Sequence, residues 1–586
     1  MIIRARKDLR RQRSVAIKIG VGAAACAVLA QGAAFATDAR SPGAVTKPVH
    51  ATKQDLAPGR MYSSPAFAID PEDPLRVVAG FADLGTRRCG LLRSTDGATT
   101  WTLAEAAPGT SSYPFCSQSQ GGVIQAPVAF GREGTLYMAL GGWDDQDGAR
   151  PGGAILLARS DNLGDSWETV EAYSARGKTG DAAENVRPVH TLAVDTESGS
   201  EDIVYITFNV SKPGFTAPNQ EPSRPMVAVS RDGGRTFAAP TDLAGNFFEP
   251  QALRDQALSA VTTTTAAPNA STTTTTTPAA GSRAATPNQA ANFAGSSGRN
   301  HIHVRVDGKG TAYVLWLSGT ANVSPSPPSA QMLSKSTDGG QTWTTTMAIP
   351  FNYDNASPRA AVTREGVIHM VYGRNPTPDV SGGGEIYHRS STDGGATWTE
   401  PKVITDDPPA GMFGQYFPNI SIAANGRVDV VWWDTRDDVG IRSNDVYYSY
   451  STDDGKTWSK NRRITDRSVD RRYGVWGINY DINSPPGVGS TEEYAIFGWD
   501  DTRNTDVTRA EYATGFGAGT QDIFTAAVQF EAVGGGTSAT AKVLLAATAG
   551  LVVVGLVLLL VAMSARRKSG PPTPKKAAAG KAPAKV

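Results

Sequence analysis

One octapeptide occurs six times in this chain and constrains its fold more than any other feature. Its pattern is S-x-D-x-G-x-T-W, and the copies occupy residues 94–101, 160–167, 230–237, 336–343, 391–398 and 451–458. These residue types suit a tight hairpin turn, because Asp and Asn accept backbone N–H bonds and Gly tolerates positive φ. Only the first copy lacks the glycine, since Ala98 takes its place.

The third position of the octapeptide carries an acid or its amide in every copy. These residues are Asp96, Asn162, Asp232, Asp338, Asp393 and Asp453. A catalytic or metal-binding role is the functional interpretation. We expect a structural role instead, because the whole octet is what a turn requires, with the last aromatic residue covering the hairpin.

The intervals between copies predict a repeated structural unit. They measure 66, 70, 106, 55 and 60 residues. The long interval contains residues 255–300, a stretch rich in Thr and Ala that we expect to be a disordered insertion and a candidate for O-glycosylation. Each interval carries signals for four short strands, as in one blade of a β-propeller.

Counting the units predicts an all-β propeller of seven blades, with six as the alternative. First strands are expected to start at Pro65, Pro127, Pro188, His301, Pro358, Pro418 and near Ile478. The seventh unit has strand signals near 478–480, 494–499 and 522–528, but no fourth strand. Residues 45–54 are candidates for that strand, and such closure would remove an open sheet edge.

The two ends of the chain look like targeting segments. Residues 1–36 combine basic residues, an apolar run and a small-residue site ending at Ala36, which predicts a cleaved signal peptide. A twin-arginine route through Arg10 and Arg11 and a lipoprotein site at Cys26 are less favoured alternatives. After a linker at 533–542, residues 543–563 carry no charge and are long enough to span a bilayer core of about 30 Å.

The charge distribution gives the expected location. Residues 564–586 are basic, which predicts a cytoplasmic tail and leaves the propeller, residues 45–532, on the outer side of the cell membrane. The formal net charge of the whole chain is zero, but residues 37–542 sum to −13. We therefore expect no nucleic-acid partner. In that compartment Cys89 and Cys116 are predicted to form a disulfide, with two separate thiols as the alternative.

The octapeptide resembles the Asp box of the sialidase superfamily, and the resemblance covers roughly residues 60–530. It implies a propeller with its Asp boxes on one face and a funnel on the other, formed by first-strand starts and by loops after second strands. Sialidases bind a carboxylate with three arginines and use a Tyr nucleophile with a Glu, plus an Asp acid/base. The family's first arginine lies in a Phe-Arg-Ile-Pro motif, where this chain has Ser63.

Candidate catalytic residues follow from this resemblance. Arg187, Arg299 and Arg359 fall at first-strand starts and are candidates for a substitute anion site; the alternative is local pairing with acids. Tyr416 is the candidate nucleophile. His303, near another strand start, is expected to be structural.

Asp434 and Asp501 lie in Trp- and Arg-containing loops after second strands. They are candidates for acid/base chemistry or cation binding, or for tying a loop to a neighbouring blade.

Two functions remain open from the sequence. One is a surface-anchored propeller that binds glycans or cell-envelope proteins. The other is a glycoside hydrolase of the exo-α-sialidase type, so whether the chain is an enzyme is undecided. We expect no cofactor and no metal in either case.

Overall fold

The computed structural model describes residues 40–54, 60–83, 86–105, 113–116, 126–143, 153–179, 183–186, 191–211, 224–244, 302–318, 329–352, 358–374, 384–407, 414–438, 442–474, 485–505 and 520–532. Nearly all of them belong to one compact unit, Gly43–Phe530. A second unit comprises Met1–Pro42 and Glu531–Val586, of which only residues 40–42 and 531–532 are described.

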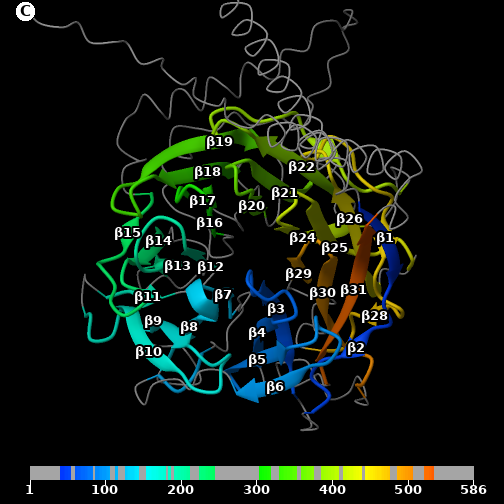
Figure 1. Cartoon of the computed structure of the whole chain (residues 1–586), viewed down its shortest axis with the longest axis horizontal. Coiled ribbons are helices and arrows are strands. Elements are labelled where there is room, and N and C mark those ends of the chain that lie inside the picture. The colour runs from blue at the N-terminus through cyan, green and yellow to red at the C-terminus, as the bar shows by residue number, and fades with distance from the viewer. Residues whose placement is uncertain are drawn as a thin grey trace, which may run out of the picture. The chain divides into compact units, whose positions relative to one another are not determined.

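The unit Gly43–Phe530 is built from seven sheets arranged in a ring (Figure 1), which we number as blades 1 to 7 in chain order. Blade 1 comprises β3 (Tyr62–Ile69), β4 (Val77–Asp83), β5 (Arg88–Ser94) and β6 (Thr102–Glu105). Blade 2 comprises β7 (Val128–Phe130), β8 (Leu136–Gly142), β9 (Ala154–Ser160) and β10 (Glu168–Ser174). Blade 3 comprises β11 (Asn185–Val186), β12 (Thr191–Asp195), β13 (Ile203–Ser211), β14 (Arg224–Ser230) and β15 (Thr241–Asp242).

The remaining blades follow the same antiparallel plan. Blade 4 comprises β16 (His303–Val306), β17 (Ala312–Ser318), β18 (Ser329–Ser336) and β19 (Thr344–Asn352). Blade 5 comprises β20 (Arg359–Val362), β21 (Ile368–Arg374), β22 (Glu385–Ser391) and β23 (Lys402–Val403). Blade 6 comprises β24 (Gln415–Ile422), β25 (Val428–Asp434), β26 (Ser443–Ser451), β27 (Arg462–Arg463) and β28 (Val469–Asp470). Blade 7 comprises β29 (Gly487–Ser490), β30 (Tyr494–Asp501), β31 (Asp522–Ala532), β1 (Arg40–Val45) and β2 (Val49–His50).

Burial explains why the second strands are so apolar. Every residue of β4, β8, β25 and β30 is buried, because neighbouring blades cover both faces of the sheet. The blades pack through shared clusters of side chains; the rings of Tyr448 in blade 6 and Phe497 in blade 7, for example, have centroids 4.6 Å apart. Outer strands face solvent, and both residues of β23 are exposed.

Blade 7 closes the ring with strands from both ends of the described chain. β31 lies between β30 and β1 in the sheet, and β2 also pairs with β31. Val49 pairs with Thr525, and the N–H of Thr46 donates to the carbonyl of Ala527 at 2.8 Å. The seven-blade prediction is therefore confirmed, and the closing segment includes residues 40–50, slightly earlier than the predicted 45–54.

The first strand of blade 7 was predicted in the wrong place. It is Gly487–Ser490, whereas the sequence favoured a start near Ile478, within a segment outside the described residues. A side chain at Gly487 would place its Cβ 2.3 Å from the carbonyl oxygen of Pro65 in blade 1. Close blade contact thus requires glycine here, and a Gly-rich strand lacks the usual β-branched signal.

Several predicted segments lie outside the described residues. They are the signal peptide 1–36, the insertion 255–300, the linker 533–542, the apolar run 543–563 and the tail 564–586. Within the described part of the chain, no helix has the length and apolar character needed to cross a membrane.

Candidate functional site

The ring has two chemically different ends. First strands lie nearest the centre of the ring (Figure 1), and neighbouring strands in each blade are antiparallel. First strands therefore begin at the same end of the ring at which second strands finish, and we call this the strand-start end. The turns between third and fourth strands, which hold the octapeptides, lie at the opposite end, the Asp-box end.

At the Asp-box end, each box is fixed by its own hydrogen bonds. In blade 4, Asp338 Oδ1 accepts from Ser336 Oγ at 2.8 Å and from Thr342 N at 3.0 Å, while Oδ2 accepts from Thr342 Oγ1 at 2.6 Å. The hydroxyl and backbone N–H of Thr342 lower the pKa of Asp338 to about 2. Asn162 makes the equivalent turn, accepting from Ser160 Oγ and Ser166 N. These side chains hold turns together and are engaged locally.

The box glycines also let adjacent blades approach each other. A Cβ at Gly234, Gly395 or Gly455 would lie 2.6 Å from Leu157, 2.0 Å from Leu333 and 2.0 Å from His388, each in the preceding blade. The box aromatic reaches across the same boundary, since Trp101 Nε1 donates to Thr525 Oγ1 of blade 7 at 2.9 Å. The octapeptide is therefore both a hairpin turn and an inter-blade contact.

At the strand-start end, Asp434 and Asp501 form two matching clasps. Asp434 Oδ2 accepts from Trp432 Nε1 at 2.9 Å and lies 2.7 Å from Arg436 Nη2. Asp501 Oδ2 accepts from Trp499 Nε1 at 2.8 Å and lies 2.8 Å from Arg503 Nη2. Both aspartates are buried. Their Oδ2 atoms therefore already have donors within the protein.

The arginines of the clasps join blades. Arg436 in blade 6 contacts Asp406, which follows the last strand of blade 5, at 3.0 Å. Arg503 in blade 7 contacts Asp466, which follows β27 of blade 6, at 2.8 Å. Of the two interpretations of the Asp-x-Arg pattern, the structure therefore supports the inter-blade tie.

Ser63, at the position of the family's first arginine, has a different environment from a carboxylate-binding site. It is buried in β3, and its hydroxyl donates to Asp500 Oδ2 at 2.9 Å. Gln521 Nε2 donates to the same oxygen at 3.1 Å. The side chain at this position therefore donates to a carboxylate of the protein, whereas the resemblance to sialidases would have placed an arginine here.

Among the described arginines, Arg359 has two buried donor atoms without a hydrogen bond, whereas Arg132, Arg159 and Arg389 have one each. It is the first residue of β20, only 3% exposed, and its Nη1 lies 2.8 Å from His303 Nε2 on β16. Its Nε and Nη2 are buried and have no hydrogen-bond partner among the described residues. Burial, followed by the nearby positive charge of Arg305, lowers the pKa of Arg359 to about 9.

The other nominated residues contribute less. Arg187 and Arg299 lie outside the described residues, so their distance from Arg359 is not described. Tyr416 is partly buried in β24, where its ring packs against Phe417 and the guanidinium of Arg471 lies 5.5 Å from the ring centre. Tyr416 belongs to the cluster between blades 6 and 7, whereas Arg359 lies at the boundary of blades 4 and 5.

Sequence analysis missed Arg305 altogether. It follows His303 by two residues on β16, so both side chains leave the strand on the same side. That spacing is the signal that could have identified it. In the described part of the chain, no group of three or more His, Cys, Asp or Glu side chains could hold a metal ion.

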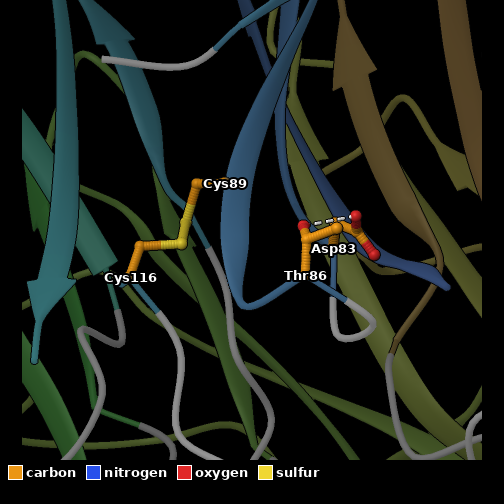
Figure 2. The surroundings of a disulfide bond; sticks show 4 residues. All are labelled: Asp83, Thr86, Cys89 and Cys116. Carbon is orange, nitrogen blue, oxygen red and sulfur yellow. Dashed lines mark hydrogen bonds between the residues drawn. A yellow bond between two sulfur atoms is a disulfide. The ribbon is translucent and has the colours of Figure 1, made fainter. Parts of the chain in front are cut away.

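A disulfide forms a further tie near the strand-start end, between Cys89 at the beginning of β5 and Cys116 in the connection to blade 2, with an S–S distance of 2.10 Å. Figure 2 shows it beside the loop in which Thr86 Oγ1 donates to Asp83 Oδ2 at 2.6 Å. At the boundary of blades 7 and 1, Arg60 Nε lies 2.7 Å from Asp522 Oδ1.

Comparison with known proteins agrees with this architecture. A model of the BNR repeat-like domain matches residues 134–430, just over half of the chain, and a BNR/Asp-box repeat matches residues 449–460. The fold and the boxes define a BNR-type β-propeller. This chain belongs to the BNR repeat-like family, within the sialidase superfamily.

Similarity to individual proteins is more distant. A search of curated proteins found no match. Similar solved structures include a Dyadobacter fermentans protein of unknown function (12% identity, 83% of this chain, 98% of the other, TM-score 0.39). They also include an ulvan lyase (11% identity, 77% of this chain, 93% of the other, TM-score 0.44). A further one is a Hadza microbial sialidase (12% identity, 64% of this chain, 63% of the other, TM-score 0.36). At these identities and scores the likeness assigns no activity to this chain.

Proposed function

We propose that this chain is an exported, membrane-anchored propeller that binds glycan or protein ligands at its strand-start end through a negatively charged group on the ligand. The observation that carries the proposal is the buried Arg359 guanidinium, with two N–H donors that lack an acceptor. A guanidinium fork suits a carboxylate or similar anion because it can donate two parallel hydrogen bonds.

Binding without hydrolysis is favoured because the nominated catalytic carboxylates already have protein partners. Asp434 and Asp501 are held by tryptophan and arginine donors, and Ser63 with Asp500 replaces the family's first arginine site. The alternative is an active exo-α-sialidase-type hydrolase. Membership of the family and the position of Arg359 at a first-strand start support this alternative.

The location rests on the sequence of the two ends. The basic-apolar segment 1–36 and the uncharged run 543–563 followed by basic residues support export, one membrane span and a cytoplasmic tail. Ligands at the cell surface, such as acidic glycans or envelope proteins, would then be accessible to the propeller.

The test uses the purified full-length chain on arrays of glycans and peptides in which acidic ligands are paired with neutral analogues. We expect binding to acidic ligands, a loss of at least tenfold in affinity for Arg359→Ala, and no change for Arg364→Ala. Arg364 is a matched control because it lies in the same blade but is 70% exposed and pairs with Glu197. Absence of any acidic ligand, or equal binding by both variants, would refute the proposal.

A turnover assay distinguishes binding alone from the alternative function, hydrolysis of a sialoside. A fluorogenic sialoside should remain intact with the wild-type chain if the protein only binds. Turnover by the wild type that disappears in Arg359→Ala would instead establish the hydrolase.

A further inference from the structure

Two positive charges lie at the boundary of blades 4 and 5, that of the buried Arg359 and that of the partly buried Arg305. Arg359 begins β20, and Arg305 lies on β16, the innermost strand of the preceding blade. Arg305 Nη1 donates to the carbonyl of Val304 at 2.7 Å, and Arg359 Nη1 contacts the imidazole of His303 at 2.8 Å. Neither guanidinium forms an ion pair with an acid among the described residues.

This arrangement is unusual because the two charges destabilise each other. Enclosure by protein lowers the pKa of Arg305 to about 10, although part of its surface remains accessible, and the charge of Arg305 contributes to the lowered pKa of Arg359. A buried charge normally has a counter-charge, and a buried donor normally has an acceptor. Here Arg359 Nε and Nη2 have no acceptor.

Arginine cannot resolve the conflict by losing its proton, because its pKa stays above neutral pH even when it is lowered. A water molecule would accept a hydrogen bond from Arg359 but would leave the two positive charges uncompensated. A small anion would accept the hydrogen bonds of Arg359 and would also offset the two positive charges.

We propose that Arg305 and Arg359, with His303 beside them, form a binding site for a small inorganic monoanion of the halide class. The anion would accept hydrogen bonds from Arg359 Nε and Nη2 while no ligand occupies these donors. The site does not require the glycan or protein ligand proposed above. A ligand carboxylate is the other source of the same charge, and the experiment distinguishes the two.

The test compares thermal unfolding of the full-length chain in sodium chloride and in sodium gluconate at equal ionic strength. Gluconate keeps the ionic strength equal but is not a halide. An anion that binds only the folded state raises the midpoint of unfolding as its concentration increases. We expect the midpoint to rise by a few degrees with chloride, and bromide to replace chloride. Equal midpoints in chloride and gluconate would overturn the proposal.

Substitution then assigns the effect to the site. Arg305→Gln should abolish the chloride-dependent rise, whereas Arg364→Gln, which alters an exposed arginine of blade 5, should retain it. Retention of the full rise in Arg305→Gln would contradict the assignment. If Arg305→Gln does not fold, the line width of the chlorine NMR signal decides the question with wild-type protein. Broadening that bromide reverses supports the site, and no broadening refutes it.

Measurements in sodium formate distinguish a halide from a ligand carboxylate as the anion bound at this site. A rise with formate but not with halides would show that the site takes carboxylates and would overturn the halide proposal. A chloride effect together with no binding on the ligand arrays would leave this site in place while refuting only the proposed function.

Discussion

The two ends of the ring join neighbouring blades in different ways. At the Asp-box end, one turn is used six times, and each box glycine for which a contact is described packs against the preceding blade. At the strand-start end, different boundaries are joined by different kinds of contact. A disulfide ties blade 1 to the connection that leads to blade 2, blades 5, 6 and 7 share Asp–Arg clasps, and Arg60 pairs with Asp522 between blades 7 and 1.

This difference between the two ends of the ring indicates at which end a ligand-binding site is expected. A repeated local turn serves the fold equally in every blade, so no copy is distinguished from the others. The strand-start end is chemically varied, and its ties at the boundaries named above are either covalent or pairs of opposite charges. The boundary of blades 4 and 5 is the exception, because an arginine meets a histidine and another arginine there.

The largest expected effect is at a clasp. Asp434→Ala would leave Arg436 and Trp432 Nε1 without their buried acceptor. We expect a loss of about 3–5 kcal/mol in the free energy of unfolding, measured by urea denaturation. Glu400→Ala, at a side chain that is 97% exposed, is the control and should change little. A loss as small as that of the control would mean that the clasps do not hold the strand-start end together.

Acid should weaken the Asp-box end through a histidine pair. His369 Nδ1 lies 3.0 Å from His388 Nε2, and burial lowers the pKa of His369 from 6.5 to about 4. The unfolded chain therefore binds a proton below pH 6.5 that the folded state does not bind until about pH 4. Stability should be unaffected above pH 6.5, and His369 alone should lower it by up to about 3 kcal/mol between these values.

The measurement for this pair is the midpoint of urea unfolding across that pH range. His369→Gln removes one titrating group and should flatten the profile. An unchanged slope in this variant would assign the acid sensitivity to other groups. Asp338 is not expected to contribute there, because its pKa is about 2.

Two glycines at the Asp-box end separate backbone strain from blade contact. Gly455 and Gly426 have φ of +80° and +82°, but only a Cβ at Gly455 would meet a neighbour, His388, at 2.0 Å. Both alanine variants should lose about 1–2 kcal/mol from backbone strain. Gly455→Ala should lose roughly 1–3 kcal/mol more from overpacking. Equal losses in urea denaturation would show that the box glycine serves the turn alone.

The smallest expected effect is Asp338→Asn in the box of blade 4. The chain already uses Asn162 at this position in blade 2, where its amide makes the equivalent bonds. We therefore expect a change within about 0.5 kcal/mol, in the range of surface substitutions. A loss several times larger would show that the ionised carboxylate matters to the boxes, beyond its hydrogen bonds.

Much of the fold could be predicted because its signals are local. The octapeptide, its spacing and the apolar second strands define the blades within short segments of chain. The Gly-rich strand Gly487–Ser490 was missed because its glycine is required by close contact with Pro65 and Phe67 of another blade.

The candidate site was only partly predictable. The sequence identified Arg359 from its place at a first-strand start, and it identified Asp434 and Asp501 as carboxylates with two possible roles. It did not identify Arg305, and it treated His303 as a structural residue. His303 and Arg359 are 56 residues apart, so their contact depends on how blades 4 and 5 pack.

The sequence by itself determined the repeat and its turns, because these depend on hydrogen bonds between residues a few positions apart. Only the tertiary structure decided which charges meet. It paired Arg436 with Asp406 and Arg503 with Asp466 across blade boundaries and left Arg359 beside Arg305, because burial and distance between blades determine whether a charge has a partner.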